Sequence, residues 1–244
     1  MLADPPPQGL ERLEVTIDGL WKRRFFHRGT NADKGAITQV FHNQDYALHR
    51  LARGEELAGR FHGLVAGDET PLIIDAGANI GTSAVWFSAT FHKAHIVAIE
   101  PDAANAALLR SNTQGLDVTV VEAALGASDG RVNLEDPGFG EWGYRTTEAA
   151  TGAIPRVSMS RLCREEIAKG RTPFIAKIDI EGAESELFAE DTGWVASFPL
   201  IIIELHDWLI PGKATSRNVL RALSAHDRDF VHIGENVFSI ANGP

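Results

Sequence analysis

The sequence predicts an α/β fold in which helices flank a mostly parallel sheet. From residue 67 onward, short apolar runs alternate with segments of helical periodicity, which is the pattern of βαβ units. Strands are expected at 72–75, 95–100, 118–122, 174–179 and 199–205, and helices near 82–91, 102–113, 183–190 and 214–226. Two later runs, 230–233 and 237–240, flank Gly234-Glu235-Asn236 and predict an antiparallel hairpin that completes a seven-stranded sheet.

The segment 1–66 is predicted to be an N-terminal α/β extension to a domain that spans residues 67–244. Its first residues, 1–8, are rich in proline and are expected to be disordered. Apolar residues on both sides of Asp18-Gly19 predict a hairpin over 11–28. Apolar residues at helical spacing then predict one helix over 39–63.

The first strand of the domain runs into a glycine turn and the start of a helix, which predicts a nucleotide site at the carboxyl end of the strand. A dinucleotide fingerprint needs glycine at the first, third and sixth positions of the turn. Gly77 fills the first position, but Asn79 and Thr82 stand at the other two. With Asp75 just before the turn, this pattern favours a ligand that carries adenosine and an amino-acid tail in place of phosphates, such as S-adenosylmethionine (SAM).

An acidic residue after the second strand fits the same ligand. Glu100 follows Gly81 by 19 positions, close to the spacing of about 20 at which a carboxylate meets ribose hydroxyls. The alternative is a solvent-facing residue at a strand end that Pro101 helps to terminate. After the third strand, Glu122 and Ala123 are expected beside the adenine. The residues predicted to bind the cofactor are Asp75, Gly77, Ala78, Asn79, Gly81, Glu100, Pro101, Glu122, Ala123, Ala124 and Asp179.

The candidate catalytic residues follow the fourth and fifth strands. Asp179 and Glu181 alternate with Lys177, so they share one side of the chain wherever it stays extended. Glu204 and His206 are likewise two positions apart. Because a histidine near carboxylates can act as a general base toward a hydroxyl group, we predict catalytic roles for His206, Asp179, Glu204 and Glu181.

Glu184 and the glycine-rich segment 137–143 complete the set of candidates. Glu184 is predicted to be an acidic residue in the first turn of a helix, where the helix dipole favours it. The glycine-rich segment 137–143 is expected to form a lid in which Trp142 stacks on a sugar, or a solvent-exposed loop with a packed tryptophan.

The sequence resembles the FkbM-type family of SAM-dependent methyltransferases over roughly residues 72–206. The shared motifs are Asp75-Ala-Gly-Ala-Asn-Ile-Gly81, Glu100-Pro101, Asn112, Ala123-Ala-Leu-Gly126, Lys177-Ile-Asp-Ile-Glu-Gly-Ala-Glu184 and Ile203-Glu-Leu-His206. The resemblance implies the Rossmann-like class I methyltransferase fold, in which a parallel sheet ends in an antiparallel hairpin. It also implies methyl transfer from SAM to a hydroxyl of a sugar, a glycolipid or a natural product.

Other functions remain open at this stage. No resident metal is predicted, but Asp179, Glu204 and His206 could instead hold Mg²⁺ and acidify a pair of hydroxyls. A non-catalytic SAM-binding partner protein is a second alternative, although the intact turn and Glu100 argue against it. A dehydrogenase is disfavoured by the missing turn glycines.

Composition narrows the class of partner. The net charge of −10 makes a nucleic-acid substrate unexpected, so the expected partner is a small-molecule or glycan acceptor. Cys163 is the only cysteine among 244 residues, which rules out an intrachain disulfide and favours a reducing compartment. We expect neither a signal peptide nor a membrane span, and therefore a cytoplasmic location.

Overall fold

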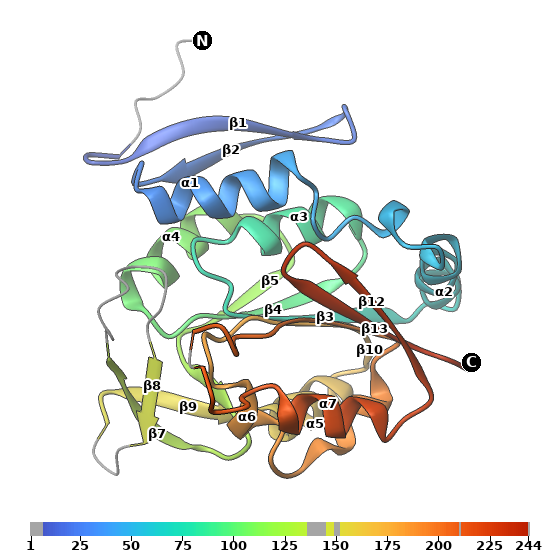
Figure 1. Cartoon of the computed structure of the whole chain (residues 1–244). Coiled ribbons are helices and arrows are strands. Elements are labelled where there is room, and N and C mark those ends of the chain that lie inside the picture. Colours follow the sequence, from blue (N-terminus) through green and yellow to red (C-terminus); the bar gives the residue numbers. More distant parts are fainter. Residues whose placement is uncertain (1–6, 136–144, 149–151, 210, 244) are drawn as a thin grey trace.

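The computed structural model describes residues 7–135, 145–148, 152–209 and 211–243 (Figure 1). The segment 137–143, in which a lid was expected, lies outside the described residues, and so do the first six residues of the proline-rich start. Within the described part of the chain, no helix is long and apolar enough to cross a membrane.

A seven-stranded sheet forms the centre of the molecule, in the order β12-β13-β11-β10-β3-β4-β5. Its strands are β3 (Thr70–Ala76), β4 (His95–Ile99), β5 (Val118–Val121), β10 (Arg171–Ile178), β11 (Leu200–Glu204), β12 (Arg228–Ile233) and β13 (Asn236–Ala241). The parallel strands are β3, β4, β5, β10 and β11. Strand β13 runs antiparallel to both β11 and β12. The predicted fold class, including the terminal hairpin, is confirmed.

The order of the strands also locates a binding crevice. From β3 the chain adds β4 and β5 on one side, and it later returns to add β10 and β11 on the other. In open α/β sheets, ligands bind at the carboxyl ends of the strands where the order reverses in this way. The carboxyl ends of β3 and β10 therefore mark the expected site.

Helices cover both faces of the sheet, which is why its inner strands β3, β4 and β11 are almost wholly buried. On one face lie α1 (Asn31–Ile37), α2 (Gly54–Ala66), α3 (Thr82–Thr90) and α4 (Ala103–Thr113), and on the other lie α5 (Met159–Ala168), α6 (Glu184–Leu187) and α7 (Arg217–Ser224) (Figure 1). Alternate residues of β3 accordingly belong to different cores. Ile73 packs in the core on the side of α1 to α4, and Leu72 and Ile74 pack in the core on the side of α5 to α7.

The N-terminal extension packs onto the face of the molecule that carries α3 and α4. Its hairpin, formed by β1 (Glu11–Ile17) and β2 (Trp21–His27), agrees with the prediction. Asn112 of α4 holds the hairpin, because its Oδ1 accepts from the backbone N–H of Phe26 at 2.8 Å and its Nδ2 donates to the carbonyl of Phe26 at 2.9 Å. Val15 and Phe25 share an apolar core with the sheet, and the division at residue 66 stays a prediction.

The single helix predicted over 39–63 is wrong. The chain instead forms a π-helical turn η1 (Thr38–His42), a short 3-10 helix η2 (Leu48–Arg50) and then α2. The break falls at Gln44, whose φ of 55° is left-handed. Apolar spacing did not reveal the break, because buried residues such as Val40 and Leu57 occur on both sides of it.

A second, four-stranded sheet was not predicted. It has the order β6-β9-β7-β8 and consists of β6 (Ala124–Gly126), β9 (Ile154–Ser158), β7 (Gly130–Glu135) and β8 (Arg145–Glu148). Its strands are three to six residues long. None of them contains a long apolar run of the kind on which the strand predictions relied.

Candidate active site

A pocket of about 230 Å³ lies at the carboxyl ends of β3, β10 and β11. The glycine turn after β3 and the first turn of α3 line one part of it, and the residues after β10 and β11 line another. The N-terminal extension lines the remainder with Ala36, Gln39, Val40 and Tyr46, none of which was predicted to belong to a site.

The conformation of the glycine turn explains its sequence. Gly77 has a φ of 73°, and a Cβ at this position would collide with the carbonyl oxygen of Asp179. Asn79 is left-handed as well, with a φ of 48°, and Gly81 caps the amino terminus of α3 with a φ of 94°. The turn therefore lies directly against the residues that follow β10, and its first position has room only for glycine.

Asp75 lies beneath the turn and does not line the pocket. Its side chain is fully buried, accepts a hydrogen bond from Ser83 Oγ at 2.7 Å, and lies 3.5 Å from Lys177 Nζ. Lys177 Nζ also donates to the carbonyl of Gly77 at 2.7 Å and lies 3.3 Å from Asp179 Oδ2. Burial raises the pKa of Asp75, and the neighbouring ammonium only partly offsets this. Lys177, which was not among the predicted site residues, thus joins Asp75, the turn and Asp179.

Glu100 is buried beside the turn. Its Oε2 accepts from the backbone N–H of Asn79 at 2.9 Å, and its Oε1 accepts from the backbone N–H of Asp102 at the same distance. Burial raises the pKa of the Glu100 carboxyl to about 7, although these hydrogen bonds favour the ionised form. Oε1 also accepts from Asn105 Nδ2 at 3.4 Å, so it is Oε2 that keeps a second lone pair for a further donor.

Neither Glu100 nor the other residues predicted near the adenosine line the pocket described above. Pro101 is partly exposed, and Ala123 and Ala124 are buried. Glu122 is exposed, and its Oε2 forms an ion pair with Arg110 at 2.9 Å. The structure therefore places Glu100, but not Glu122, in contact with the glycine turn.

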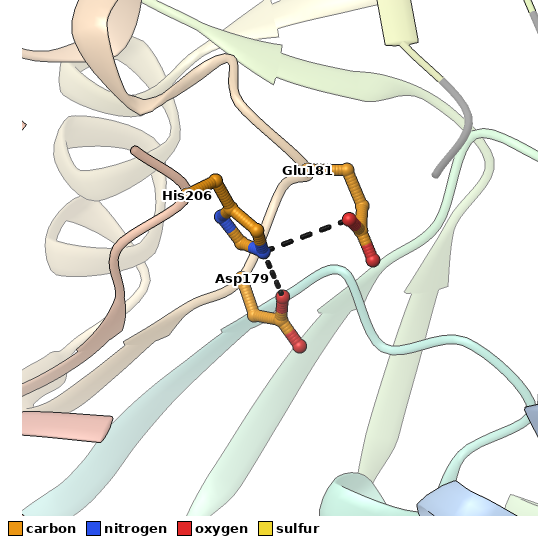
Figure 2. A group of neighbouring side chains, drawn as sticks. All are labelled: Asp179, Glu181 and His206. Atoms are coloured by element: carbon orange, nitrogen blue, oxygen red, sulfur yellow. Dashed lines mark ion pairs between the residues drawn. The ribbon is translucent and has the colours of Figure 1, made fainter. Parts of the chain in front are cut away.

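The predicted catalytic residues form one cluster around His206, and Figure 2 shows three of them, Asp179, Glu181 and His206. The Nε2 atom of the buried imidazole lies 3.7 Å from Asp179 Oδ1 and 3.6 Å from Glu181 Oε2. Glu204 Oε1 lies 3.5 Å from the same nitrogen. The four residues predicted to be catalytic therefore lie together and all line the pocket, and their catalytic role stays a prediction.

Glu184 holds the other nitrogen of this ring. Its Oε1 lies 2.8 Å from His206 Nδ1 and also accepts from the backbone N–H groups of Ile180 and Gly182, each at 3.3 Å. Glu184 lies in the first turn of α6, as predicted, but it is also buried and contacts the His206 ring, which was not predicted. The sequence gave no sign of this contact, because it depends on the left-handed turn at Glu181, with a φ of 53°.

The carboxylates around His206 change the proton affinity of the whole cluster. Burial alone would lower the pKa of His206, but Glu184, Asp179 and Glu181 raise it to about 9. Burial and the charge of Asp179 raise the pKa of Glu181 to about 7 and that of Glu204 to about 8. His206 is therefore cationic at neutral pH in the ligand-free protein, in contrast to the near-neutral pKa assumed from the sequence.

The cluster also has the composition of a cation site. Ligand atoms of Asp179, Glu181 and His206 all lie within 4.8 Å of one another and could hold a metal ion. Two carboxylates and one imidazole are acceptable ligands for a hard divalent cation. The set differs from the one proposed from the sequence, in which Glu204 stood in the place of Glu181.

Comparisons with known proteins identify the family of this chain. Residues 75–231 match the methyltransferase FkbM domain. The hexuronic acid methyltransferase AglP of Haloferax volcanii is 28% identical over 192 residues, which cover 75% of this chain and 77% of that protein.

Two solved structures show distant similarity. Cofactor-bound Rv0187 from MTB has a TM-score of 0.43 and 14% identity, and the similarity covers 87% of this chain and 92% of that one. Precorrin-6y C5,15-methyltransferase from Geobacter metallireducens has a TM-score of 0.40 and 13% identity, with 70% and 79% covered. The match to the FkbM domain, in contrast, covers more than half of the chain and includes both the glycine turn and the His206 cluster. The protein is a methyltransferase of the FkbM family.

Proposed function

We propose that this methyltransferase transfers a methyl group from SAM to a hydroxyl of a sugar, a glycolipid or a related natural product. The observation that carries the proposal is the His206 cluster, in which Nε2 faces a pocket that begins at the glycine turn. The buried imidazole is held from behind by Glu184, so the nitrogen that faces the pocket is the one available to an acceptor.

The residues around the turn fit SAM. Glu100 can accept from a ribose hydroxyl with the remaining lone pair of Oε2, and the buried Oδ1 of Asn79 has no hydrogen-bond partner in the described structure. The acidic groups that line the pocket favour the ammonium and sulfonium charges of the cofactor. When bound, SAM supplies a methyl group already activated by a positively charged sulfur.

The protein then has to align the acceptor and to remove its proton. His206 Nε2 would accept the hydroxyl proton as the acceptor oxygen takes the methyl group that bound SAM would supply, and the sulfur would leave with the electron pair of its bond to that methyl as S-adenosylhomocysteine. Asp179, Glu181 and Glu204 stabilise the imidazolium that results. A neighbouring sulfonium disfavours the cationic ring before the reaction, which counteracts the raised pKa of His206.

A hydroxyl acceptor on a sugar is supported by the relative from Haloferax volcanii, whose name specifies a hexuronic acid. The test is an acceptor screen with methyl-labelled SAM, using glycosides and polyhydroxylated natural products. Label transferred to an oxygen of the acceptor supports the proposal. Transfer to nitrogen or carbon only, by a protein that binds S-adenosylhomocysteine, would contradict it.

A second candidate is metal-assisted methyl transfer, which the arrangement of Asp179, Glu181 and His206 favours. A divalent cation held by these residues would lower the pKa of a bound hydroxyl, and His206 would be a ligand instead of a base. Loss of activity in EDTA, followed by its recovery on addition of Mg²⁺ or Mn²⁺, would establish metal-assisted methyl transfer. Full activity in EDTA would leave His206 as the base.

A further inference from the structure

Trp208 is an exposed aromatic residue at the mouth of the catalytic pocket. Its side chain is 64% exposed, and its ring centroid lies 6.2 Å from that of His206. It lines the catalytic pocket and also an adjoining pocket of about 410 Å³, which Glu204 and Glu235 line as well. An exposed indole beside the reacting groups offers a flat apolar surface on which a ring can stack.

Acidic groups dominate the two pockets. Asp179, Glu181, Glu204 and Glu235 line one or both. Of the residues whose side chains the structure describes, no arginine lines either pocket, and Lys177 is the only lysine. The charge of Lys177 is already engaged by Asp75 and Asp179.

The two histidines of these pockets do not reverse this balance. Four carboxylates surround His206, and the exposed His232 adds a single imidazole to the adjoining pocket. An acceptor with a carboxylate or phosphate would therefore meet the negative charges of Asp179 and Glu235, which also help to raise the pKa of Glu204, whereas the hydroxyls of an uncharged sugar can donate to Glu204 and Glu235.

We propose that the acceptor is a sugar without an acidic group, whose ring stacks on Trp208 while its hydroxyls donate to Glu204 and Glu235. The proposal rests on the proposed function, because it assumes a hydroxyl acceptor beside His206. A hexuronic acid is disfavoured, since its carboxylate would add a further negative charge to an already acidic site.

The test uses neutral methyl pyranosides of the gluco, galacto and manno series, each paired with its uronic acid. Binding is measured by ligand-observed NMR titration in saturating S-adenosylhomocysteine, at low and high salt and with EDTA or Mg²⁺. At low salt, the affinity for at least one neutral glycoside should exceed the affinity for its uronic acid by about tenfold or more. High salt should reduce this ratio of affinities, because it screens the charges.

Variants separate stacking from charge. Trp208→Ala should weaken the neutral glycoside about tenfold or more without changing the affinity for S-adenosylhomocysteine, and Trp208→Phe should restore most of the binding. Phe230→Ala is the matched control, because Phe230 is also an exposed aromatic residue but lines neither pocket. Glu235→Lys should improve binding of the uronic acid about tenfold by reversing an exposed charge.

The proposal is overturned if every uronic acid binds as well as its neutral partner, with or without Mg²⁺, or if Trp208→Ala changes nothing. Failure of all the neutral glycosides in a protein that binds S-adenosylhomocysteine would overturn it too. Absence of S-adenosylhomocysteine binding would instead contradict the proposed function.

Discussion

At the scale of single residues, Glu100 is the most direct test of the cofactor assignment. Removing its carboxylate takes away the acceptor for the ribose hydroxyls and for the backbone N–H groups of Asn79 and Asp102. We expect Glu100→Ala to weaken the binding of SAM and S-adenosylhomocysteine by about 1–3 kcal/mol, as measured by calorimetry. Glu122→Ala is the control, because Glu122 is exposed and pairs with Arg110. Unchanged affinity in Glu100→Ala would refute the ribose assignment.

The same residue predicts a pH dependence. The pKa of Glu100 rises from 4.5 to about 7 on folding, so the folded, ligand-free protein holds this proton more tightly and its stability should fall as pH rises between those values. Ribose hydroxyls donate to the ionised form, so affinity for S-adenosylhomocysteine should increase as pH rises through about 7, with release of a proton. In Glu100→Gln, calorimetry in buffers of different ionisation enthalpy should no longer detect that proton.

His206 carries the prediction about chemistry. General-base assistance is worth about 10²–10⁴-fold, so His206→Ala should reduce kcat by that much while the affinity for SAM stays nearly unchanged. Glu184 acts through the ring, because it contacts Nδ1 and not the pocket. Glu184→Gln, which can still contact Nδ1, should lower kcat less than Glu184→Ala and leave KM for SAM unchanged. Turnover within about threefold of wild type in His206→Ala would make the histidine structural.

At the scale of elements, Asn112 joins three parts of the molecule. Besides its two hydrogen bonds to Phe26, its Nδ2 donates to the carbonyl of Ile80 at 2.8 Å. Asn112→Ala leaves several of these buried groups without a partner, so we expect unfolding free energy to fall by about 2–4 kcal/mol in a denaturant titration. The control Gln114→Ala, at an exposed position of the same segment, should have little effect. Equal stability of the two variants would show that the hairpin is held by other contacts.

The elements of the central sheet were predictable because their signal is local. Leu72–Ile74 and Ile201–Ile203 are apolar and buried on both faces, and the terminal hairpin has a recognisable turn. The missed sheet formed by β6, β9, β7 and β8 consists of short strands. These strands have no long apolar run by which they could be recognised. The predicted helix over 39–63 failed for the opposite reason, because its apolar spacing continues across a left-handed residue, Gln44.

The same distinction separates the predicted parts of the site from the missed ones. Asp179, Glu181, Glu204 and His206 were found because the carboxyl ends of neighbouring parallel strands meet at one edge of the sheet. Glu184 reaches His206 only through the turn at Gly182, and Tyr46 reaches the pocket from a distant segment. Contacts of this kind depend on the path of the chain in space, which residue spacing does not encode.

At the scale of the whole molecule, the extension and the sheet share packing that a boundary at residue 66 would cut. Leu57, Phe61 and Phe25 belong to the same apolar core as Ile73 and Ile96. We expect a protein of residues 67–244 to unfold at a lower temperature than one of residues 7–244 and to bind S-adenosylhomocysteine at least about tenfold more weakly, because it loses this core and part of the pocket wall. Matching melting temperatures and affinities would establish residues 67–244 as an autonomous domain.

The origin of the pocket wall affects how relatives of this protein diverge. The residues that match the FkbM domain, 75–231, contain the glycine turn and the His206 cluster, but Ala36, Gln39, Val40, Tyr46 and Glu235 all lie outside them. Mutations in this outer wall change the lining of the pocket without replacing any residue of the His206 cluster. Two descendants of one ancestor can therefore inherit the same chemistry and acquire different acceptors, and exchanging residues 31–46 between them is a direct way to exchange their selectivity.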